Sequence, residues 1–252
     1  MGLLAWGALF SSQGPLRLLQ PAPTATPTPR PLATPASPTP TRTPTPLPTG
    51  QGLAAAVSAF MAASYIQFDV AGTYTFTSER QLVTVELSGR GAMARPDRFR
   101  SVLSGQYDSY FGFYKVGRDL RCQSPKGTFD PPECTPAFGA PGKGGSPYLA
   151  VLYLQSPSSV RDLGLETVGG RRLRRFAFKP DLAKVLTQEP GIGPALERLD
   201  IAADVWVDPA SNLPQRLDIR VYQPGREGTE VWTMTLTFRD YGQPVQITLP
   251  PP

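Results

Sequence analysis

The sequence contains no histidine, and this absence removes several classes of catalytic site at once. Without histidine there is no Ser–His or Cys–His nucleophile and no histidine-bound metal. No serine is followed three residues later by lysine, which excludes the S-x-x-K form of serine chemistry. The glycine-rich stretch GAPGKGGSP lacks the flanking strand and helix that a phosphate-binding loop requires. These absences predict a protein that is not an enzyme and that uses no cofactor.

Paired carboxylates are the remaining route to catalysis, because two acids can hydrolyse a glycosidic bond without histidine. Asp204, Asp208, Asp218 and Asp240 lie in or beside the C-terminal segments that alternate like strands. Asp208 is explained by an Asp-Pro turn and Asp240 by the end of a strand, while outward carboxylates on strands are usually only solvated. The pattern favours structural roles for these acids over hydrolysis.

Only two cysteines are present, Cys122 and Cys134, both in the stretch RCQSPKGTFDPPECTP. Gly, Pro and Ser crowd this stretch, which predicts a loop. Two cysteines that close a small loop behind a signal-like segment indicate a disulfide, and therefore an exported protein. The alternative is a metal site with the two cysteines as ligands, although zinc takes four ligands and the sequence has no histidine to complete the set.

The first fifty residues carry few charges and offer little to bury. Residues 21–50 consist mainly of Pro, Thr, Ala and Ser, which predicts a disordered, extended linker. Residues 1–20 contain the apolar run GLLAWGALFSS, too short to span a bilayer but typical of part of a signal peptide. No basic residue precedes it, so we expect the start of such a signal upstream; a disordered apolar tail is the alternative. Residues 51–252 suffice for one domain.

The net charge of +5 does not indicate a nucleic-acid-binding protein. Three of the 25 basic residues precede residue 51, which leaves 22 basic residues against 20 acidic ones in the predicted domain. The run RRLRRF, residues 171–176, is dense in cations. Its simplest interpretation is an exposed strand, and the functional alternative is contact of Arg172 and Arg174 with anionic headgroups at a membrane surface.

Most of the predicted domain shows the period-two alternation of antiparallel strands with one covered face. Segment 53–65 differs, because its apolar residues fall at helical spacing and its alanines favour a helix. Residues 146–156 fit a short helix or a buried strand equally well. Residues 180–200 look helical, with Pro180 in the first turn and a break at Pro190-Gly191. The predicted strands are 68–77, 81–89, 98–105, 110–117, two hairpins within 163–179 and 204–222, then 230–241 and 242–250. The fold class is therefore α+β around one curved antiparallel sheet.

The last fifty residues carry a family resemblance, in VWVDPASNLPQRLDI followed by TFRDYGQPVQITLP. This order is similar to the mycobacterial LppX/LprG lipoproteins and their wider LolA/LolB-like superfamily. The earlier part of residues 51–252 fits the same layout more loosely, and the chain lacks the cysteine that lipoprotein members acylate. The matching residues are Trp206, Val207, Asp208, Leu213, Pro214, Phe238, Asp240, Tyr241, Gly242, Pro244, Val245, Ile247 and Pro250.

The resemblance implies an unclosed β-barrel whose concave face is covered by helices, with an apolar cavity between them for lipid or acyl chains. It further implies a carrier of lipid or acylated lipoprotein in the cell envelope. We expect a carrier or sensor of this kind that is monomeric. A protein-interaction or envelope-stress sensor domain of the same fold, with a filled core, is the alternative. The large apolar residues on the covered face then either line a cavity or form ordinary core. The candidates are Phe60, Tyr65, Tyr74, Phe76, Leu87, Leu152, Trp206 and Trp232.

Overall fold

The computed structural model describes residues 49–78, 81–105, 110–124, 127–129, 146–188, 199–224 and 229–251. The predicted signal-like segment 1–20 lies outside these residues, as does the predicted linker 21–50 except for its last two positions. Helix α1, Thr49–Ala62, begins just before the predicted domain boundary at residue 51. In the described part of the chain, no helix is long and apolar enough to cross a membrane.

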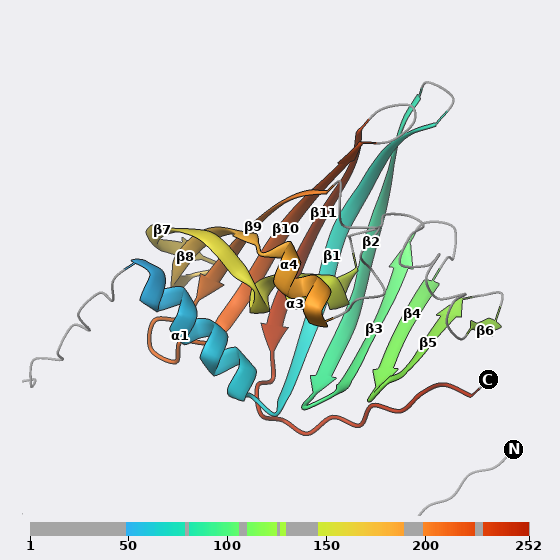
Figure 1. The fold of residues 1–252 in the computed structure, drawn as a ribbon, viewed down its shortest axis with the longest axis horizontal. Coiled ribbons are helices and arrows are strands. Elements are labelled where there is room, and N and C mark those ends of the chain that lie inside the picture. The colour runs from blue at the N-terminus through green and yellow to red at the C-terminus, as the bar shows by residue number, and fades with distance from the viewer. Residues whose placement is uncertain are drawn as a thin grey trace, which may run out of the picture. The chain divides into compact units, whose positions relative to one another are not determined.

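Eleven described strands form one antiparallel sheet in the order β6-β5-β4-β3-β2-β1-β11-β10-β9-β8-β7 (Figure 1). The first strand, β1, lies inside the sheet and pairs with both β2 and β11, so the two ends of the domain meet there. Among the described strands, the edges β6 and β7 do not pair, and the sheet is not closed into a barrel. The strands are β1 Tyr65–Ser78, β2 Gln81–Ala94, β3 Arg98–Gly105, β4 Tyr110–Val116, β5 Asp119–Ser124, β6 Gly127–Phe129, β7 Pro157–Val168, β8 Arg171–Pro180, β9 Asp200–Val207, β10 Pro214–Pro224 and β11 Thr229–Arg239.

Alternation of apolar and polar residues determines which side of the sheet is covered, as the sequence predicts. In β11, Trp232, Met234, Leu236 and Phe238 are buried in the main core, while the intervening threonines lie on the other side. We call the side that carries this core the inner face and the opposite side the outer face. The prediction of an α+β fold with one curved antiparallel sheet is confirmed.

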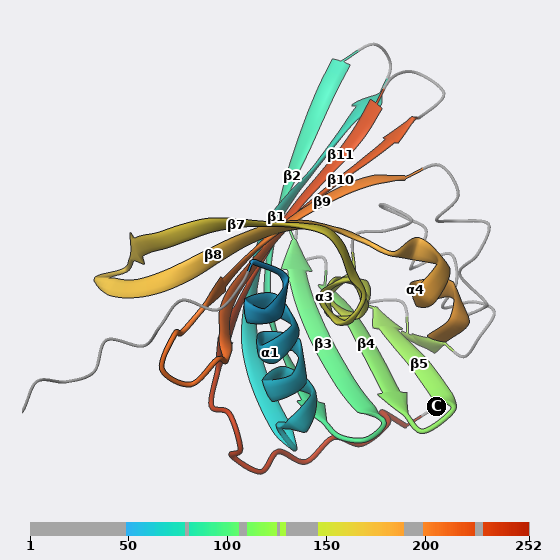
Figure 2. The same ribbon diagram turned by 60° about the vertical axis from the view of Figure 1, so that its left-hand side comes forward.

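Three described helices lie on the inner face: α1, α3 (Pro147–Gln155) and α4 (Leu182–Gln188), as Figures 1 and 2 show. The ring of Phe60 in α1 meets that of Phe238 in β11 edge-on, with centroids 5.2 Å apart. The ambiguous segment 146–156 is helical, because the Ser146 side chain caps it and Pro147 suits its first turn. The upper ends of β1, β2, β10 and β11 in Figure 1 extend beyond all three helices.

The predicted last strand, 242–250, is wrong. After β11 the chain turns at Asp240 and Gly242, both at positive φ, and Gly242 N donates to Tyr65 O at 2.9 Å. It then runs past the ends of the strands at the bottom of Figure 1 without joining the sheet. Both edges of β1 are already occupied by β2 and β11, and Pro244 has no N–H to donate to a ladder.

This C-terminal segment instead packs on the outer face. Ile247 is fully buried against Ala92 and Ala94 of β2, in a small cluster separate from the main core. Arg98 donates to the Ile247 carbonyl at 3.3 Å, and Arg121 donates to the Pro250 carbonyl at 2.5 Å. The segment therefore acts as a strap across the ends of β2 to β5.

Two further expectations need correction. Pro180 ends strand β8 and is not in a helix; α4 begins at Leu182, where the Asp181 carboxylate accepts from Lys184 N at 3.3 Å. The second half of that predicted helix, 189–198, lies outside the described residues.

Cys122 is buried in strand β5 and not in a loop. Because Cys134 lies outside the described residues, the disulfide stays a prediction.

Replacing Ile247 tests the strap. Ile247→Ala removes a fully buried side chain, and we expect the free energy of unfolding to fall by about 2–5 kcal/mol. Ile247→Val, which removes a single methylene, should cost only about 0.5–1.5 kcal/mol. Urea unfolding of the three proteins measures both values. Equal midpoints for the alanine variant and the parent would mean that the strap is not part of the folded unit.

Candidate functional site

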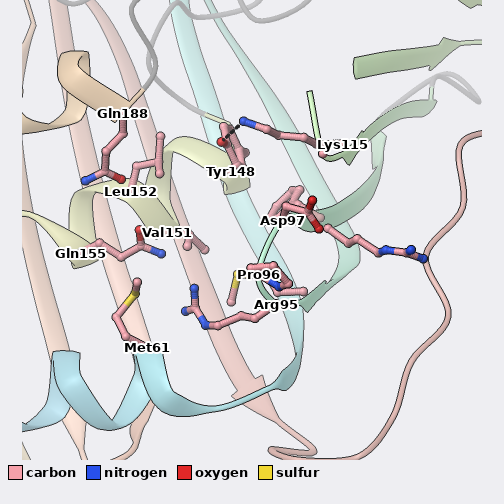
Figure 3. A pocket seen from close by; sticks show the side chains of 14 residues that line it. Met61, Arg95, Pro96, Asp97, Lys115, Tyr148, Val151, Leu152, Gln155 and Gln188 are labelled. Carbon is pink, nitrogen blue, oxygen red and sulfur yellow. Dashed lines mark hydrogen bonds between the residues drawn. The ribbon is translucent and has the colours of Figure 1, made fainter. Parts of the chain in front are cut away.

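A cavity of about 310 Å³ lies between the inner face and the helices, at the end of the sheet where β2 turns into β3 (Figure 3). Helix α1 contributes Met61, helix α3 contributes the facing wall, and Gln188 closes one side from the end of α4. The lining residues are Met61, Met93, Arg95, Pro96, Asp97, Arg98, Phe99, Lys115, Gly117, Tyr148, Val151, Leu152, Gln155 and Gln188. The lining residues therefore come from segments that lie far apart in the sequence, between Met61 and Gln188.

Polar and apolar surface line the cavity in nearly equal measure, and the apolar part comes mainly from buried side chains. Met93 and Phe99 are buried on the sheet side, and Val151 and Leu152 are buried on the side of α3. Met61 is 43% exposed, which is unusual for a large apolar side chain in this protein. Methionine is flexible and polarisable, so it adapts to ligands of irregular shape. The geometry suits an apolar group that enters beside Met61.

Arg95 provides the main polar group on one wall, and in Figure 3 its guanidinium points toward the space between Met61 and Gln155. One terminal nitrogen donates to the Phe60 carbonyl at 3.2 Å, and the guanidinium lies 5.4 Å from the Phe60 ring centroid. Its Nε is buried and has no hydrogen-bond partner among the described residues. Burial lowers the pKa of the Arg95 guanidinium from its ordinary value.

At the opposite end of the cavity lies a second cation, Lys115, which already contacts a tyrosine. Lys115 Nζ donates to the Tyr148 hydroxyl at 2.8 Å and lies 5.0 Å from the centroid of that ring. Tyr148 in turn packs against Phe99 and Phe113, with ring centroids 5.1 and 5.4 Å away. These contacts hold α3 on the sheet and give this end of the cavity a rigid aromatic wall.

A second void, beneath α3 and over β10 and β11, has no room for a water molecule. Its lining includes Tyr153, whose pKa is raised by burial, and Trp232, whose Nε1 is buried without a partner among the described residues. Tyr74 stacks on Trp232 and on Phe76, with centroids 4.7 and 4.8 Å apart. Among the described residues, this void is therefore too small to hold a ligand.

The predicted ligand residues therefore separate into groups. Leu152 lines the cavity, and Phe60 lies beside it as the hydrogen-bond acceptor of Arg95. Tyr74, Phe76 and Trp232 form the aromatic stack described above, and Leu87 packs half-buried against the same core. That a ligand contacts any of them stays a prediction.

Tyr65 and Trp206 do not belong on the inner face, which corrects the expectation. Tyr65 packs beside the small cluster of the strap. Trp206 alternates with Val205 and Val207, which are buried in the main core, so its own side chain lies on the outer face. There its indole lies 5.0 Å from the guanidinium of Arg175 and of Arg216, and its Nε1 donates to Glu166 at 3.2 Å.

The two arginines predicted to meet headgroups differ in their surroundings. Arg174 donates to the Asp162 carboxylate through Nε at 2.9 Å and through a second, shorter contact, and its guanidinium packs over the Phe176 ring. Arg172 is exposed near the β7–β8 turn. Only Arg172 is therefore placed to reach a surface without first breaking an ion pair.

The carboxylates considered for catalysis are paired with arginines or used in a turn. Asp204 binds Arg175 at 3.1 Å, and Asp218 binds Arg216 at 2.7 Å. Asp208 accepts from Ala210 N and pairs with Arg171 at the exposed end of the β9–β10 hairpin, while Asp240 pairs with Arg239. In the described part of the chain, no group of three or more acids and cysteines is placed to hold a metal.

Sequence reasoning missed the residues that make the cavity polar. Arg95 precedes Pro96 in the turn between β2 and β3, where an arginine is ordinarily exposed. Nothing in the local sequence shows that its side chain folds back to the end of α1. By contrast, the alternation along β9 shows that Trp206 points to the face opposite that of Val205 and Val207. Its position on the outer face could therefore have been predicted from the sequence.

Neither a protein-family model nor a curated protein matches this chain. Solved structures to which this chain is similar include the following three. The Mycobacterium tuberculosis lipoprotein LppX is 12% identical with a TM-score of 0.43, covering 79% of this chain and 97% of its own. LprF from Mycobacterium bovis is 13% identical with a TM-score of 0.45, covering 80% and 96%. A LolA-superfamily protein from Nitrosomonas europaea is 9% identical with a TM-score of 0.34, covering 80% and 96%.

LppX and the LolA superfamily are the proteins that the closing motif of this chain resembles. At these identities and TM-scores the likenesses decide nothing about a ligand or a partner. The function has to be argued from the cavity itself.

The ion pair between Arg174 and Asp162 gives a pH prediction. Burial alone would raise the pKa of Asp162, but hydrogen bonds from Arg174 and Gly164 outweigh burial and lower it below the ordinary 3.8. The stabilisation is therefore fully present above pH 3.8 and is lost as the pH falls through the lower folded value. We expect Asp162→Asn to cost about 1–3 kcal/mol at neutral pH, and less in acid, by urea unfolding.

Asp200→Asn is the matched control, because its pair with Lys179 is largely exposed and should contribute little. A stability difference between parent and Asp162→Asn that does not change on acidification would contradict the assignment.

Proposed function

We propose that this chain is an exported, non-enzymatic carrier or sensor that binds the acyl chain of a lipid or lipid-modified protein in the cell envelope. The observation that carries the proposal is the cavity of about 310 Å³ on the covered side of the sheet, where an apolar surface formed by Met93, Val151 and Leu152 adjoins polar side chains. Ligand pockets are roughly 300–1,000 Å³ and mostly apolar, so this one lies at the small end of that range. It accommodates part of a ligand and leaves the remainder outside.

The chemistry of the walls supports an aliphatic ligand. Each methylene group moved from water into an apolar site contributes ~0.8 kcal/mol, so even a short buried length of chain gives measurable affinity. Met61 is the exposed apolar group at the mouth, and a chain lying across it would remove that surface from water. The pairing of the carboxylates with arginines, noted above, supports a role in binding over a role in catalysis.

A second candidate function is a protein-interaction or envelope-stress sensor domain with a filled core. The packed space under α3, which has no room for water, favours it. In that case the cavity at the β2–β3 turn would be an incidental gap, and partners would contact the surface. The two functions differ in whether the cavity holds anything.

Blocking the cavity from its exposed side tests the proposal. Met61→Trp enlarges a side chain that is 43% exposed, so it fills the mouth without overpacking the core. Displacing about two methylene groups of ligand at ~0.8 kcal/mol each weakens binding roughly tenfold. Titration with a fluorescent fatty acid measures this change. Native mass spectrometry of the parent, purified from membranes, should show a bound lipid.

Leu82→Trp is the control, because Leu82 is 73% exposed on β2 and does not line the cavity. Its affinity for the probe should equal that of the parent. A parent protein that carries no lipid and does not bind the probe would overturn the proposal and favour the interaction domain.

A further inference from the structure

Arg95 has hydrogen-bonding capacity that the protein does not use. A guanidinium carries five N–H donors, and buried donors in folded proteins nearly always have partners. Among the described residues, the Arg95 guanidinium donates to one acceptor, the Phe60 carbonyl, and its Nε is buried without a partner. The Nε has no surface that a ligand could reach, so a ligand acceptor would bind the terminal nitrogens of the guanidinium, which point toward the space between Met61 and Gln155.

The charge of Arg95 is also unbalanced. In the described part of the chain, no carboxylate forms an ion pair with it, whereas Arg174, Arg175, Arg216 and Arg239 all have acidic partners. Of the other basic residues that line the cavity, Arg98 donates to the Ile247 carbonyl of the strap and Lys115 to the Tyr148 hydroxyl, whereas the Arg95 guanidinium points toward the space beside Met61. A partly buried cation without a counter-ion is unfavourable unless an anion joins it.

A purely structural role explains part of this arrangement. By donating to the Phe60 carbonyl, Arg95 satisfies one of the last carbonyls of α1, a common position for a basic side chain. The Phe60 ring adds a cation–π contact at 5.4 Å. Neither contact uses the Nε, and neither neutralises the charge. The helix cap therefore positions the guanidinium beside the cavity and leaves it able to bind.

We infer that the ligand is an anionic amphiphile, whose carboxylate or phosphate binds Arg95 while its apolar chain lies against Met61, Val151 and Leu152. This inference rests on the proposed function and narrows it. Carboxylates and phosphates match the planar guanidinium with paired, charge-assisted hydrogen bonds. A neutral lipid of the same chain length leaves Arg95 unpaired and binds less tightly.

The experiment compares probes that differ only in the headgroup. Decanoate, decanol and decyl phosphate are titrated against the full chain by calorimetry, with acetate and inorganic phosphate as anions that lack a chain. A charged hydrogen bond corresponds to roughly 10- to 100-fold in affinity, so the two anionic amphiphiles should bind that much more tightly than decanol. Acetate and inorganic phosphate should bind far more weakly than either amphiphile.

Variants assign the preference to Arg95. Arg95→Met should reduce decanoate binding to the level of decanol and leave decanol unchanged. Arg95→Lys keeps a charge and a donor to the end of α1, and should retain part of the preference. Arg100→Met removes an exposed arginine from the outer face of the neighbouring strand β3 and should change nothing. Urea unfolding of each variant identifies any that does not fold.

The outcomes separate the two proposals. If the parent protein binds decanoate and decanol equally tightly, the inference that the ligand is anionic is wrong, whereas the proposed function still holds. This comparison needs no variant. Binding of no amphiphile would overturn the proposed function. Inorganic phosphate binding as tightly as decyl phosphate, and lost in Arg95→Met, would make this a site for a free anion and overturn the acyl-chain ligand.

Discussion

A single sheet with one strongly apolar face has to be covered from that side alone, and the other features of this domain depend on that constraint. Nothing like a second sheet is present among the described residues, so three helices and the curvature of the sheet must exclude water from the inner face. The contact of Phe60 with Phe238 places α1 over the middle of the sheet, where β1 joins the last strand. Coverage is good there and weaker toward the ends of the strands.

The cavity lies where this coverage becomes incomplete. The end of α1, the middle of α3 and the end of α4 each contribute residues to the lining near the β2–β3 turn and leave a space between them. Arg95 bridges part of the gap by binding the end of α1, which leaves a cation beside exposed apolar surface. An apolar wall next to an unbalanced charge is the combination that recognises an amphiphile, because each half of such a ligand finds a partner.

The sequence predicted the sheet well because alternation along a strand is a local property. In β11, Trp232, Met234, Leu236 and Phe238 alternate with threonines and lie inward, as that alternation predicts. Asn212 adopts the positive φ that the β9–β10 turn requires. The last segment failed because Val245 and Ile247 alternate like a strand, yet no free edge exists beside β1. Alternation reports which residues are buried and not which strand, if any, they pair with.

The candidate site was predicted far less well, for a physical reason. A large aromatic residue looks the same in sequence whether it fills a core, as Trp232 does, or lies between two arginines, as Trp206 does. The cavity depends on how three helices pack against the sheet and against one another, which is a property of tertiary packing. Arg95, in a short turn, gives no local signal of its burial.

A crystal structure of the protein with decanoate tests the central claim most directly. We predict its carboxylate within hydrogen-bond distance of the Arg95 guanidinium, and its chain against Val151 and Leu152 beneath the side chain of Met61. A chain bound instead along the uncovered ends of β1 and β2, with Arg95 unchanged and the cavity empty, would contradict the account.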